Sequence, residues 1–204
     1  MKSITIHTSH TKLLFMYICI EGIDGAGKSL QVKLLSEKLK KCGYKVIQIK
    51  EPTDSEIGKL IRKLLRKEVN NALMTLLFAA DRIILSEKIK KLLKKGYLVI
   101  SDRCLWSSFV YQSIDIGEDW VEEVNKYALK PDITIFLDVD VDVAMKRCEK
   151  KEIFENSSYL NKARRKYLQL AKKHNFIIID ANNDIKTVHN EILKVIAAKI
   201  QKKE

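Results

Sequence analysis

The residues with the clearest chemistry form one run near the start of the chain, which matches the phosphate-binding pattern G-x-x-x-x-G-K-[ST]. The run consists of Gly22, Ile23, Asp24, Gly25, Ala26, Gly27, Lys28 and Ser29. Glycines let successive backbone N–H groups approach phosphate oxygens, while the lysine adds positive charge and the hydroxyl can ligate Mg²⁺. We therefore expect this run to bind a nucleoside triphosphate such as ATP, with Ser29 on the metal.

The flanking sequence predicts the elements that this motif requires. Residues 17–20 form a short apolar strand, and apolar residues at helical spacing predict a helix that starts after the motif and ends near Gly43. A chance glycine-rich turn would not require a strand before it and a helix after it. The phosphate-loop interpretation is therefore favoured.

The remaining chain continues the alternation of strand and helix. Apolar segments predict strands at 45–49, 97–101, 132–137 and 176–179. Helices are expected at about 55–66, 71–95, 141–150, 156–173 and 184–202, with two more between the third and fourth strands. Because such strands require cover on both faces, we expect a three-layer α/β P-loop fold with a five-stranded parallel sheet. We place residues 1–204 in one domain, and we interpret residues 1–15 either as an N-terminal extension or as the result of a misassigned translation start before Met16.

Composition favours a protein of the cytoplasm. No apolar run approaches the roughly 20 residues of a membrane span, and no apolar core of a signal peptide is present. The cysteines at positions 19, 42, 104 and 148 have unrelated spacings, which predicts neither a zinc site nor a disulfide framework. We expect a soluble protein that contacts no membrane.

The net charge of +12 raises the question of nucleic-acid binding. The lysines cluster on helix faces and helix ends, where solvation and the helix dipole explain them without a nucleic acid. We expect no specific nucleic-acid partner. A positive field of this kind would still attract small anionic substrates.

Two charged residues follow the predicted strand 97–101. Asp102 can hold Mg²⁺, or it can cap the next helix. Arg103 can grip a phosphate through two parallel hydrogen bonds, or it can form an ion pair. Parallel sheets bind ligands at the carboxyl ends of their strands, which favours the phosphate and metal functions for this pair.

A second constellation lies on the predicted helix 71–95, where Phe78 and Arg82 share one face. Phe78 can stack on a nucleotide base while Arg82 hydrogen-bonds its edge. Periodicity alone would instead place Phe78 in the core.

Together these segments resemble the thymidylate kinases in order and spacing. The resemblance rests on the phosphate loop with Asp24 inside it, F-x-x-x-R from Phe78, D-R-x-x-x-S from Asp102, and P-D-I-T-I-F-L-D at 131–138, and it runs from Met16 nearly to the C-terminus. It implies transfer of the ATP γ-phosphoryl group to dTMP, giving dTDP and ADP in dTTP biosynthesis. A homodimer is implied as well.

The resemblance also implies roles for individual residues. Asp24 would contact the sugar 3′-hydroxyl, Phe78 would stack on thymine, Arg82 would read the base edge and Arg103 would hold the acceptor phosphate. The positions that line the acceptor pocket, or supply charge to its phosphate, would be Ser108, Tyr111, Gln112 and Lys50.

Three positions depart from the family pattern, and one is the loop at 50–53, which lacks the arginine common beside its proline and leaves Lys50 to supply phosphate charge. The lid candidate at about 147–155 offers Arg147, Lys150 and Lys151 as catalytic cations beside Lys28 and Arg103. A lysine cannot reproduce the bidentate phosphate contacts of an arginine.

Cys104 occupies the third of these positions, where the family places a larger side chain beside the sugar 2′ position. Trp106 or Tyr111 would then have to fill that space to exclude ribonucleotides.

Three alternatives stay open at this point. A kinase of the same architecture could act on another nucleotide, which base preference would reveal. A P-loop ATPase or nucleic-acid-binding protein would show salt-sensitive DNA or RNA binding and no phosphoryl transfer. A degenerate kinase would bind nucleotides without turnover, although Lys28, Ser29, Asp102 and Arg103 are all present.

Overall fold

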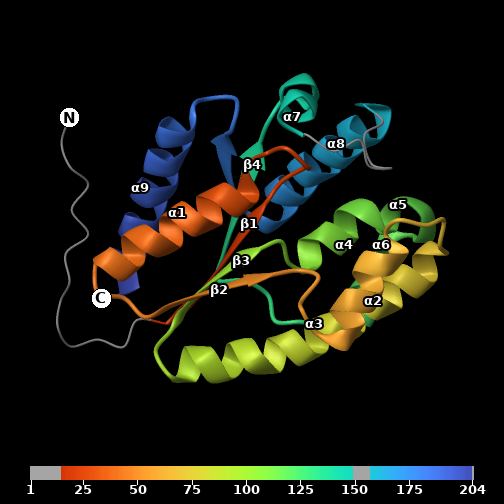
Figure 1. The fold of residues 1–204 in the computed structure, drawn as a ribbon, viewed down its shortest axis with the longest axis horizontal. Coiled ribbons are helices and arrows are strands. Elements are labelled where there is room, and N and C mark those ends of the chain that lie inside the picture. Colours follow the sequence, from red (N-terminus) through yellow and green to blue (C-terminus); the bar gives the residue numbers. More distant parts are fainter. Residues whose placement is uncertain (1–14, 149–156, 204) are drawn as a thin grey trace.

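The computed structural model describes residues 15–148 and 157–203, which form a five-stranded parallel sheet flanked by helices (Figure 1). The strands are β1 (Met16–Glu21), β2 (Val46–Lys50), β3 (Leu98–Asp102), β4 (Ile133–Asp138) and β5 (Ile177–Asp180). Their order in the sheet is β2-β3-β1-β4-β5, and every neighbouring pair is parallel. The predicted P-loop fold is confirmed.

Strand register brings the polar strand ends to one edge of the sheet. Ile20 of β1 and Lys50 of β2 both lie opposite Asp102 of β3, and Asp138 of β4 lies opposite Asp180 of β5. The residues that follow β1, β2 and β3 are therefore neighbours in space, although long stretches of chain separate them.

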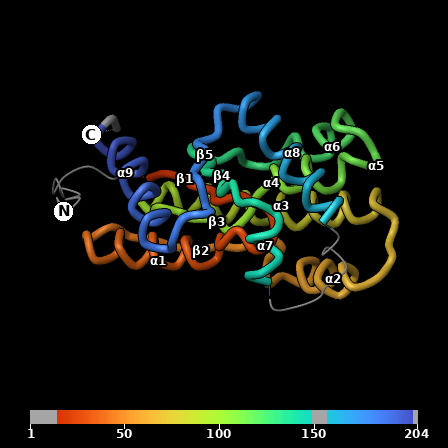
Figure 2. Tube along the Cα trace, turned by 90° about the horizontal axis from the view of Figure 1, so that it is seen from above, coloured from red at the N-terminus to blue at the C-terminus, as the bar shows by residue number. Residues whose placement is uncertain are grey.

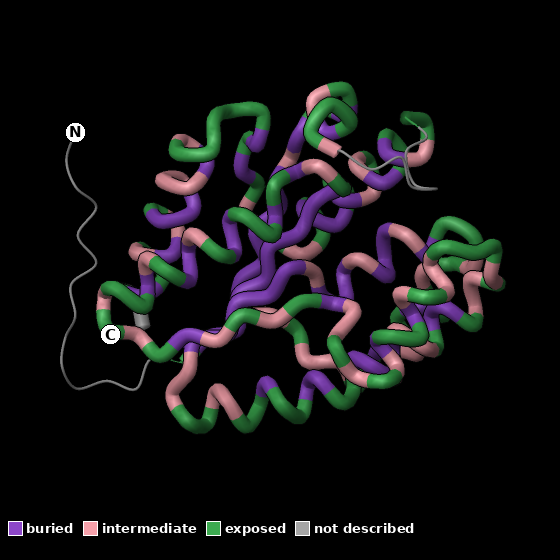
Figure 3. Tube along the Cα trace, viewed as in Figure 1, coloured by how far each residue is buried: buried purple, intermediate pink, exposed green. Residues whose placement is uncertain are grey.

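The core is built from apolar side chains on both faces of the central strands of the sheet. All residues of β1 and β3 are buried, whereas the edge strands β2 and β5 alternate in exposure. The buried segments run together through the middle of the molecule (Figure 3). A continuously apolar strand needs helices on both faces of the sheet, which is the arrangement observed.

Helices cover both faces. On one face α1 (Lys28–Lys41) packs against α9 (Ile185–Lys203) and the first three strands. The opposite face carries α3 (Asn71–Lys94), α4 (Leu105–Tyr111) and α8 (Ser157–His174), as the view from above shows (Figure 2). The smaller helices are α2 (Glu56–Leu64), which packs on α3, and α5 (Ser113–Ile116), α6 (Glu118–Val124) and α7 (Val141–Arg147).

Most predicted elements agree with the structure to within a few residues. The exception is the segment between β3 and β4, which holds three short helices where the sequence indicated two. Gly117, with φ of +85°, separates α5 from α6, so one helical pattern becomes two. Residues 1–14 of the expected extension and residues 149–155 of the expected lid lie outside the described residues. Within the described ranges no helix is long and apolar enough to cross a membrane.

Candidate active site

The phosphate loop joins β1 to α1 with glycines at its tight positions. Gly25 has φ of +80°, and a Cβ there would lie 2.2 Å from the carbonyl oxygen of Ala144 in α7. Gly27 has φ of +89° and directly precedes the first residue of α1, Lys28. A larger side chain at Gly25 would strain the backbone and clash with α7. The backbone conformation and close packing of the loop therefore require glycine at this motif position.

Lys28 lies beneath this loop. It is 7% exposed, its Nζ donates a hydrogen bond to Ile23 O at 2.8 Å, and Asp24 Oδ1 is 3.7 Å away. Burial, together with the nearby charge of Arg103, lowers the pKa of Lys28 to about 8, although Asp24 opposes the shift. A buried cation whose pKa is lowered in this way is poised to gain from a bound phosphate anion.

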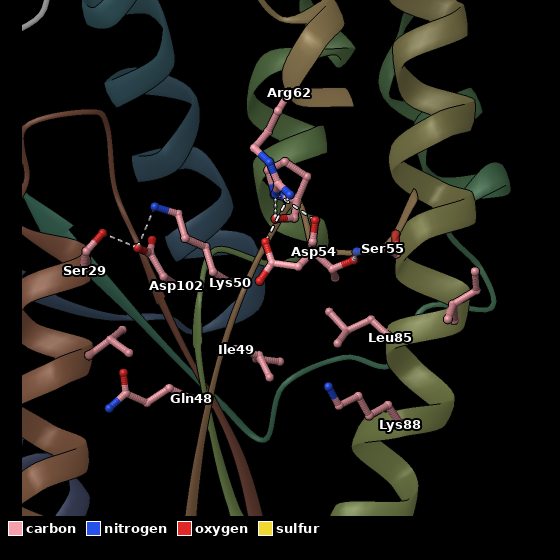
Figure 4. A pocket seen from close by; sticks show the side chains of 14 residues that line it. Ser29, Gln48, Ile49, Lys50, Asp54, Ser55, Arg62, Leu85, Lys88 and Asp102 are labelled. Carbon is pink, nitrogen blue, oxygen red and sulfur yellow. Dashed lines mark hydrogen bonds and ion pairs between the residues drawn. The ribbon is translucent and has the colours of Figure 1, made fainter. Parts of the chain in front are cut away.

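Ser29 and Asp102 meet where a divalent cation would sit. The Ser29 hydroxyl donates to Asp102 Oδ2, and Lys50 Nζ is 3.7 Å from the same oxygen (Figure 4). Asp102 is 3% exposed, and its other oxygen, Oδ1, has no hydrogen-bond partner among the described residues. A buried carboxylate oxygen without a partner beside a hydroxyl fits Mg²⁺, which prefers such oxygen ligands. The helix-cap alternative is not supported, because the residue that precedes α4 is Cys104.

Arg103 connects the phosphate loop with α4. Its Nη2 donates to Asp24 Oδ1 at 2.5 Å, and its Nη1 lies 3.3 Å from Gly22 O and 3.2 Å from Ser107 Oγ. The Arg103 charge, with help from Lys28, holds the pKa of Asp24 well below its usual range although burial opposes this. The backbone of Arg103 has φ of +73°, an unfavourable conformation for this residue type that is common at functional sites. The ion-pair interpretation is therefore realised, and it places the guanidinium beside the phosphate loop.

A buried carboxylate, Glu21, supports Arg103 from below. Glu21 is fully buried and accepts hydrogen bonds from Tyr167 Oη at 2.7 Å, Ser107 Oγ at 2.9 Å and Cys104 N at 2.9 Å. The Tyr167 hydroxyl also lies 3.2 Å from Arg103 Nη1. Sequence reasoning missed both Glu21 and Tyr167. The place of Glu21 at the end of an apolar strand was a usable signal, whereas nothing in the sequence indicated that Tyr167 would reach it.

The structure corrects the expectation for Cys104. Its side chain is 1% exposed and its Sγ lies 3.5 Å from Glu21 Oε1, so it points into the sheet. Burial raises the pKa of Cys104 to about 11, which keeps the thiol protonated. Trp106 is also buried and donates to Thr134 Oγ1 at 3.1 Å. Trp106 is therefore a core residue, whereas Tyr111 is only partly buried.

Phe78 and Arg82 form a second cluster with Glu51. Arg82 is 3% exposed, and its Nε and Nη2 contact Glu51 Oε2 at 2.8 and 2.7 Å. Phe78 is half-buried and does not belong to the core, and its ring centroid lies 6.0 Å from the Arg82 guanidinium. Burial raises the pKa of Glu51, and the charge of Arg82 opposes that rise. The core alternative for Phe78 is not what the structure shows.

The other predicted acceptor residues surround these two arginines. Ser108 Oγ lies 3.3 Å from Arg82 Nη1, and the Tyr111 ring lies 5.3 Å from the Arg103 guanidinium. Gln112 is 8% exposed and ends α4 by donating its backbone N–H to Ser108 O. The structure thus brings α4 between the two arginines.

The loop from β2 to α2 is held by a residue that sequence reasoning did not select. Asp81 accepts hydrogen bonds from Thr53 N at 2.8 Å, from Thr53 Oγ1 at 2.5 Å and from Ser55 Oγ at 2.6 Å. Arg62 binds the same loop through Pro52 O at 2.9 Å (Figure 4). Both contacts fix the segment that carries Glu51.

A cavity of about 750 Å³ opens next to the metal-site residues (Figure 4). Ser29, Lys50 and Asp102 line one end, and Leu85 and Lys88 of α3 line the other. Phe78, Arg82 and Arg103 are not part of its lining. The cavity therefore meets the site at the metal end only.

Of the three lid candidates, only Arg147 lies within the described residues. Arg147 Nη1 donates to Ala181 O, just after β5, at 2.8 Å. Arg147 is the last residue of α7, and Ala144 of this helix touches the phosphate loop at Gly25. Lys150 and Lys151 lie outside the described residues.

Comparison with known proteins identifies the family. The family model described as thymidylate kinase matches residues 20–192. The chain belongs to the thymidylate kinase family. A probable thymidylate kinase of Methanocaldococcus jannaschii is 46% identical over 182 residues, 87% of this chain and 94% of that protein. One of Methanothermobacter thermautotrophicus is 43% identical over 187 residues, 89% and 94% of the two chains.

A solved member of the thymidylate kinase family confirms the fold. The thymidylate kinase of Candida albicans has a TM-score of 0.80 with this chain at 28% sequence identity, covering 91% of this chain and 92% of that one. The resemblance drawn from the phosphate loop and the F-x-x-x-R and D-R-x-x-x-S motifs is confirmed, and the chain is a nucleoside monophosphate kinase.

Proposed function

We propose that this kinase transfers the γ-phosphoryl group of ATP to dTMP and releases dTDP and ADP. The observation that carries the proposal is the position of Arg103, whose guanidinium contacts Asp24 in the phosphate loop and Ser107 in the helix that also carries Ser108. One cation therefore touches both the donor side and the acceptor side of the site. A simple ATPase would not need the acceptor side.

Phosphoryl transfer requires positioned groups and positive charge more than covalent chemistry. Lys28 and the backbone of residues 22–29 hold the ATP phosphates, and Arg103 holds the phosphate of dTMP. Asp24, which is ionised beside Arg103, accepts a hydrogen bond from the sugar 3′-hydroxyl. When bound, Mg²⁺ held by Ser29 and Asp102 supplies positive charge to the phosphate oxygens.

The base is recognised by a stacking face and a hydrogen-bonding edge. Phe78 stacks on thymine and Arg82 donates to its edge, while Ser108, Tyr111 and Gln112 line the pocket. Lys50 supplies charge from the end of β2, where its side chain is 65% exposed and free to turn toward a phosphate. A half-buried ring beside a buried guanidinium supports this assignment.

The cations that complete the site come from the lid at about 147–155 of the single kinase domain. Arg147 is the last residue of α7, and this helix contacts the phosphate loop. The side chain of Arg147 can therefore reach a nucleotide held there. Lys150 and Lys151 act beside it as point charges.

The decisive experiment measures ADP formation by the purified protein with Mg²⁺ and ATP against dTMP, dUMP, ribothymidine monophosphate, dCMP, dGMP, AMP, CMP and UMP. We expect strong preference for dTMP. Activity with a different acceptor would replace the substrate, and ATP hydrolysis without any acceptor dependence would overturn the proposal.

We further propose a homodimer formed through α3. Large apolar side chains are exposed at helical spacing along this helix and on the neighbouring α2, and they are Leu73, Leu76, Ile83, Ile84 and Leu60. Each of these is at least 40% exposed, which is costly for a stripe of this size unless a partner covers it. Light scattering should show a dimer that Leu76→Lys converts to a monomer, while the matched change Leu168→Lys on α8 leaves it intact. A native monomer would exclude the proposal.

The remaining proposals concern the compartment and the partners of the enzyme. We propose that the enzyme acts in the cytoplasm, without a membrane or a specific nucleic acid as partner. The cysteines at positions 19, 42 and 104 are present as free thiols, which suits a reducing compartment. Filter binding to DNA and RNA across a salt series tests the nucleic-acid statement, and retention at physiological salt would contradict it.

A further inference from the structure

The Arg82 guanidinium is held from three separate elements. Glu51 after β2 takes one N–H from Nε and one from Nη2, and Ser108 of α4 lies 3.3 Å from Nη1. The third partner is Asn125, the residue that ends α6, whose Oδ1 accepts a short hydrogen bond from Nη1. No sequence motif pointed to Asn125.

Asn125 presents its oxygen to Arg82 in a fixed orientation. Its side chain is in a residue only 4% exposed, and its Nδ2 donates to Val121 O at 2.8 Å. With the NH₂ group committed to the helix, the carbonyl oxygen must face the guanidinium, because Asn has one group of each kind. The amide cannot flip without losing both hydrogen bonds.

These contacts leave one N–H bond of the Arg82 guanidinium without a partner among the described residues. A guanidinium carries five N–H bonds. Contacts with described residues use Nε–H, both N–H bonds of Nη1 and one of Nη2, so one N–H of Nη2 remains for a ligand. A lone donor matches the O4 acceptor of thymine or uracil and opposes the N4 amino group of cytosine.

We propose that Asn125 is a positioning residue that sets base selectivity by accepting a hydrogen bond from Nη1 of Arg82. The proposal rests on the function proposed above for Arg82. Without the Asn125 oxygen, Nη1 gains an unpaired N–H and the guanidinium can rotate about its contact with Glu51. The remaining donor then loses its direction, and an acceptor base loses its advantage over a donor base.

The test measures kcat/KM for dTMP and for dCMP, with the KM for ATP as an internal reference. Asn125→Ala should lower the dTMP to dCMP ratio by about tenfold or more, because an unpaired buried donor typically costs about that much. The KM for ATP should stay unchanged, since Asn125 makes no contact with the phosphate loop among the described residues. Asn125→Asp keeps an acceptor for Arg82 but loses the N–H that Asn125 donates to Val121 O, so the ratio should recover only in part.

Ser86→Ala is the matched control. Ser86 lies one turn after Arg82 on α3, and its hydroxyl accepts the N–H of Leu129 at 2.9 Å, so it ties α3 to the same connection without touching Arg82. This variant should lose stability without changing the ratio. If the Ala variant does not fold, Asn125→Leu fills the same volume without an acceptor.

Failure of the inference and failure of the proposed function give different results. If Arg82→Leu alters the ratio and folded Asn125→Ala does not, the positioning role is wrong. If Arg82→Leu also leaves the ratio unchanged, Arg82 does not read the base. If Ser86→Ala lowers the ratio as much as Asn125→Ala, the effect is general loosening of α3 and the inference is overturned.

Discussion

The two arginines of the site are held in contrasting ways. Arg103 lies in what we call the phosphate region (Asp24, Lys28, Ser29, Asp102, Arg103), where Asp24 is 51% exposed. Arg82 lies in the base region (Glu51, Phe78, Arg82, Ser108, Asn125), where Glu51, Arg82 and Asn125 are each at most 5% exposed. The carboxylate partner of Arg103 is therefore open to solvent, whereas the carboxylate partner of Arg82 is buried.

This difference matches what the proposed function asks of each region. Phosphates arrive with their own charge, so contacts in the phosphate region can exchange a partner such as Asp24 for a ligand at little cost. A base edge is neutral and offers few hydrogen bonds, so its reader must already be rigid before binding. Rigid placement of a buried charge requires that nearly every donor be paired, as it is for Arg82.

The largest expected effect compares the two carboxylates directly. Glu51→Ala removes the partner of a buried guanidinium and should lower the free energy of unfolding by about 3–5 kcal/mol. Asp24→Ala removes a carboxylate that is itself 51% exposed, and it should change stability by less than about 1 kcal/mol while severely reducing turnover. Urea unfolding followed by circular dichroism measures both, and equal losses of stability would show that the regions do not differ as described.

A smaller effect is expected at the lid side of the phosphate region. Arg147→Ala should lower kcat more than about tenfold, or about 1.4 kcal/mol of barrier, because the proposed function assigns this cation to the transferring phosphoryl group. Exposed Lys33 on α1 provides a matched control as Lys33→Ala. Steady-state kinetics with saturating dTMP checks this, and an unchanged kcat would remove Arg147 from the catalytic residues.

The smallest effect is a pH dependence of ATP binding. The pKa of Lys28 is lowered to about 8, so its charge is complete below pH 7 and is lost as pH rises through 8. ATP affinity should therefore fall about threefold between pH 7.5 and 8.5, with proton uptake on binding. Calorimetry in buffers of different ionisation enthalpy measures that uptake, and Lys28→Ala should abolish it. Affinity that is flat across this range would mean that Lys28 titrates elsewhere.

The sequence predicted the phosphate region far better than the base region. Lys28, Ser29, Asp102 and Arg103 lie within motifs at the ends of apolar strands, and the register of a parallel sheet brings such ends together. A local pattern therefore determined a three-dimensional site.

The base region depends on contacts that no local pattern encodes. Glu51 and Arg82 are 31 residues apart, and Arg82 and Asn125 are 43 apart. Each pairing follows from how helices pack, which periodicity does not determine. The predicted side-chain direction of Cys104 was wrong for the same reason, because a residue beside a motif can face either the sheet or the cleft.

One measurement tests the division of labour between the two regions most directly. It compares kcat/KM for dTMP and dCMP in the native enzyme, in Arg103→Ala and in Arg82→Leu. We predict that Arg103→Ala lowers both values together and preserves their ratio, because both acceptors carry the same phosphate. Arg82→Leu should lower dTMP selectively and collapse the ratio. If both variants change the ratio alike, the separation of phosphate binding from base recognition is contradicted.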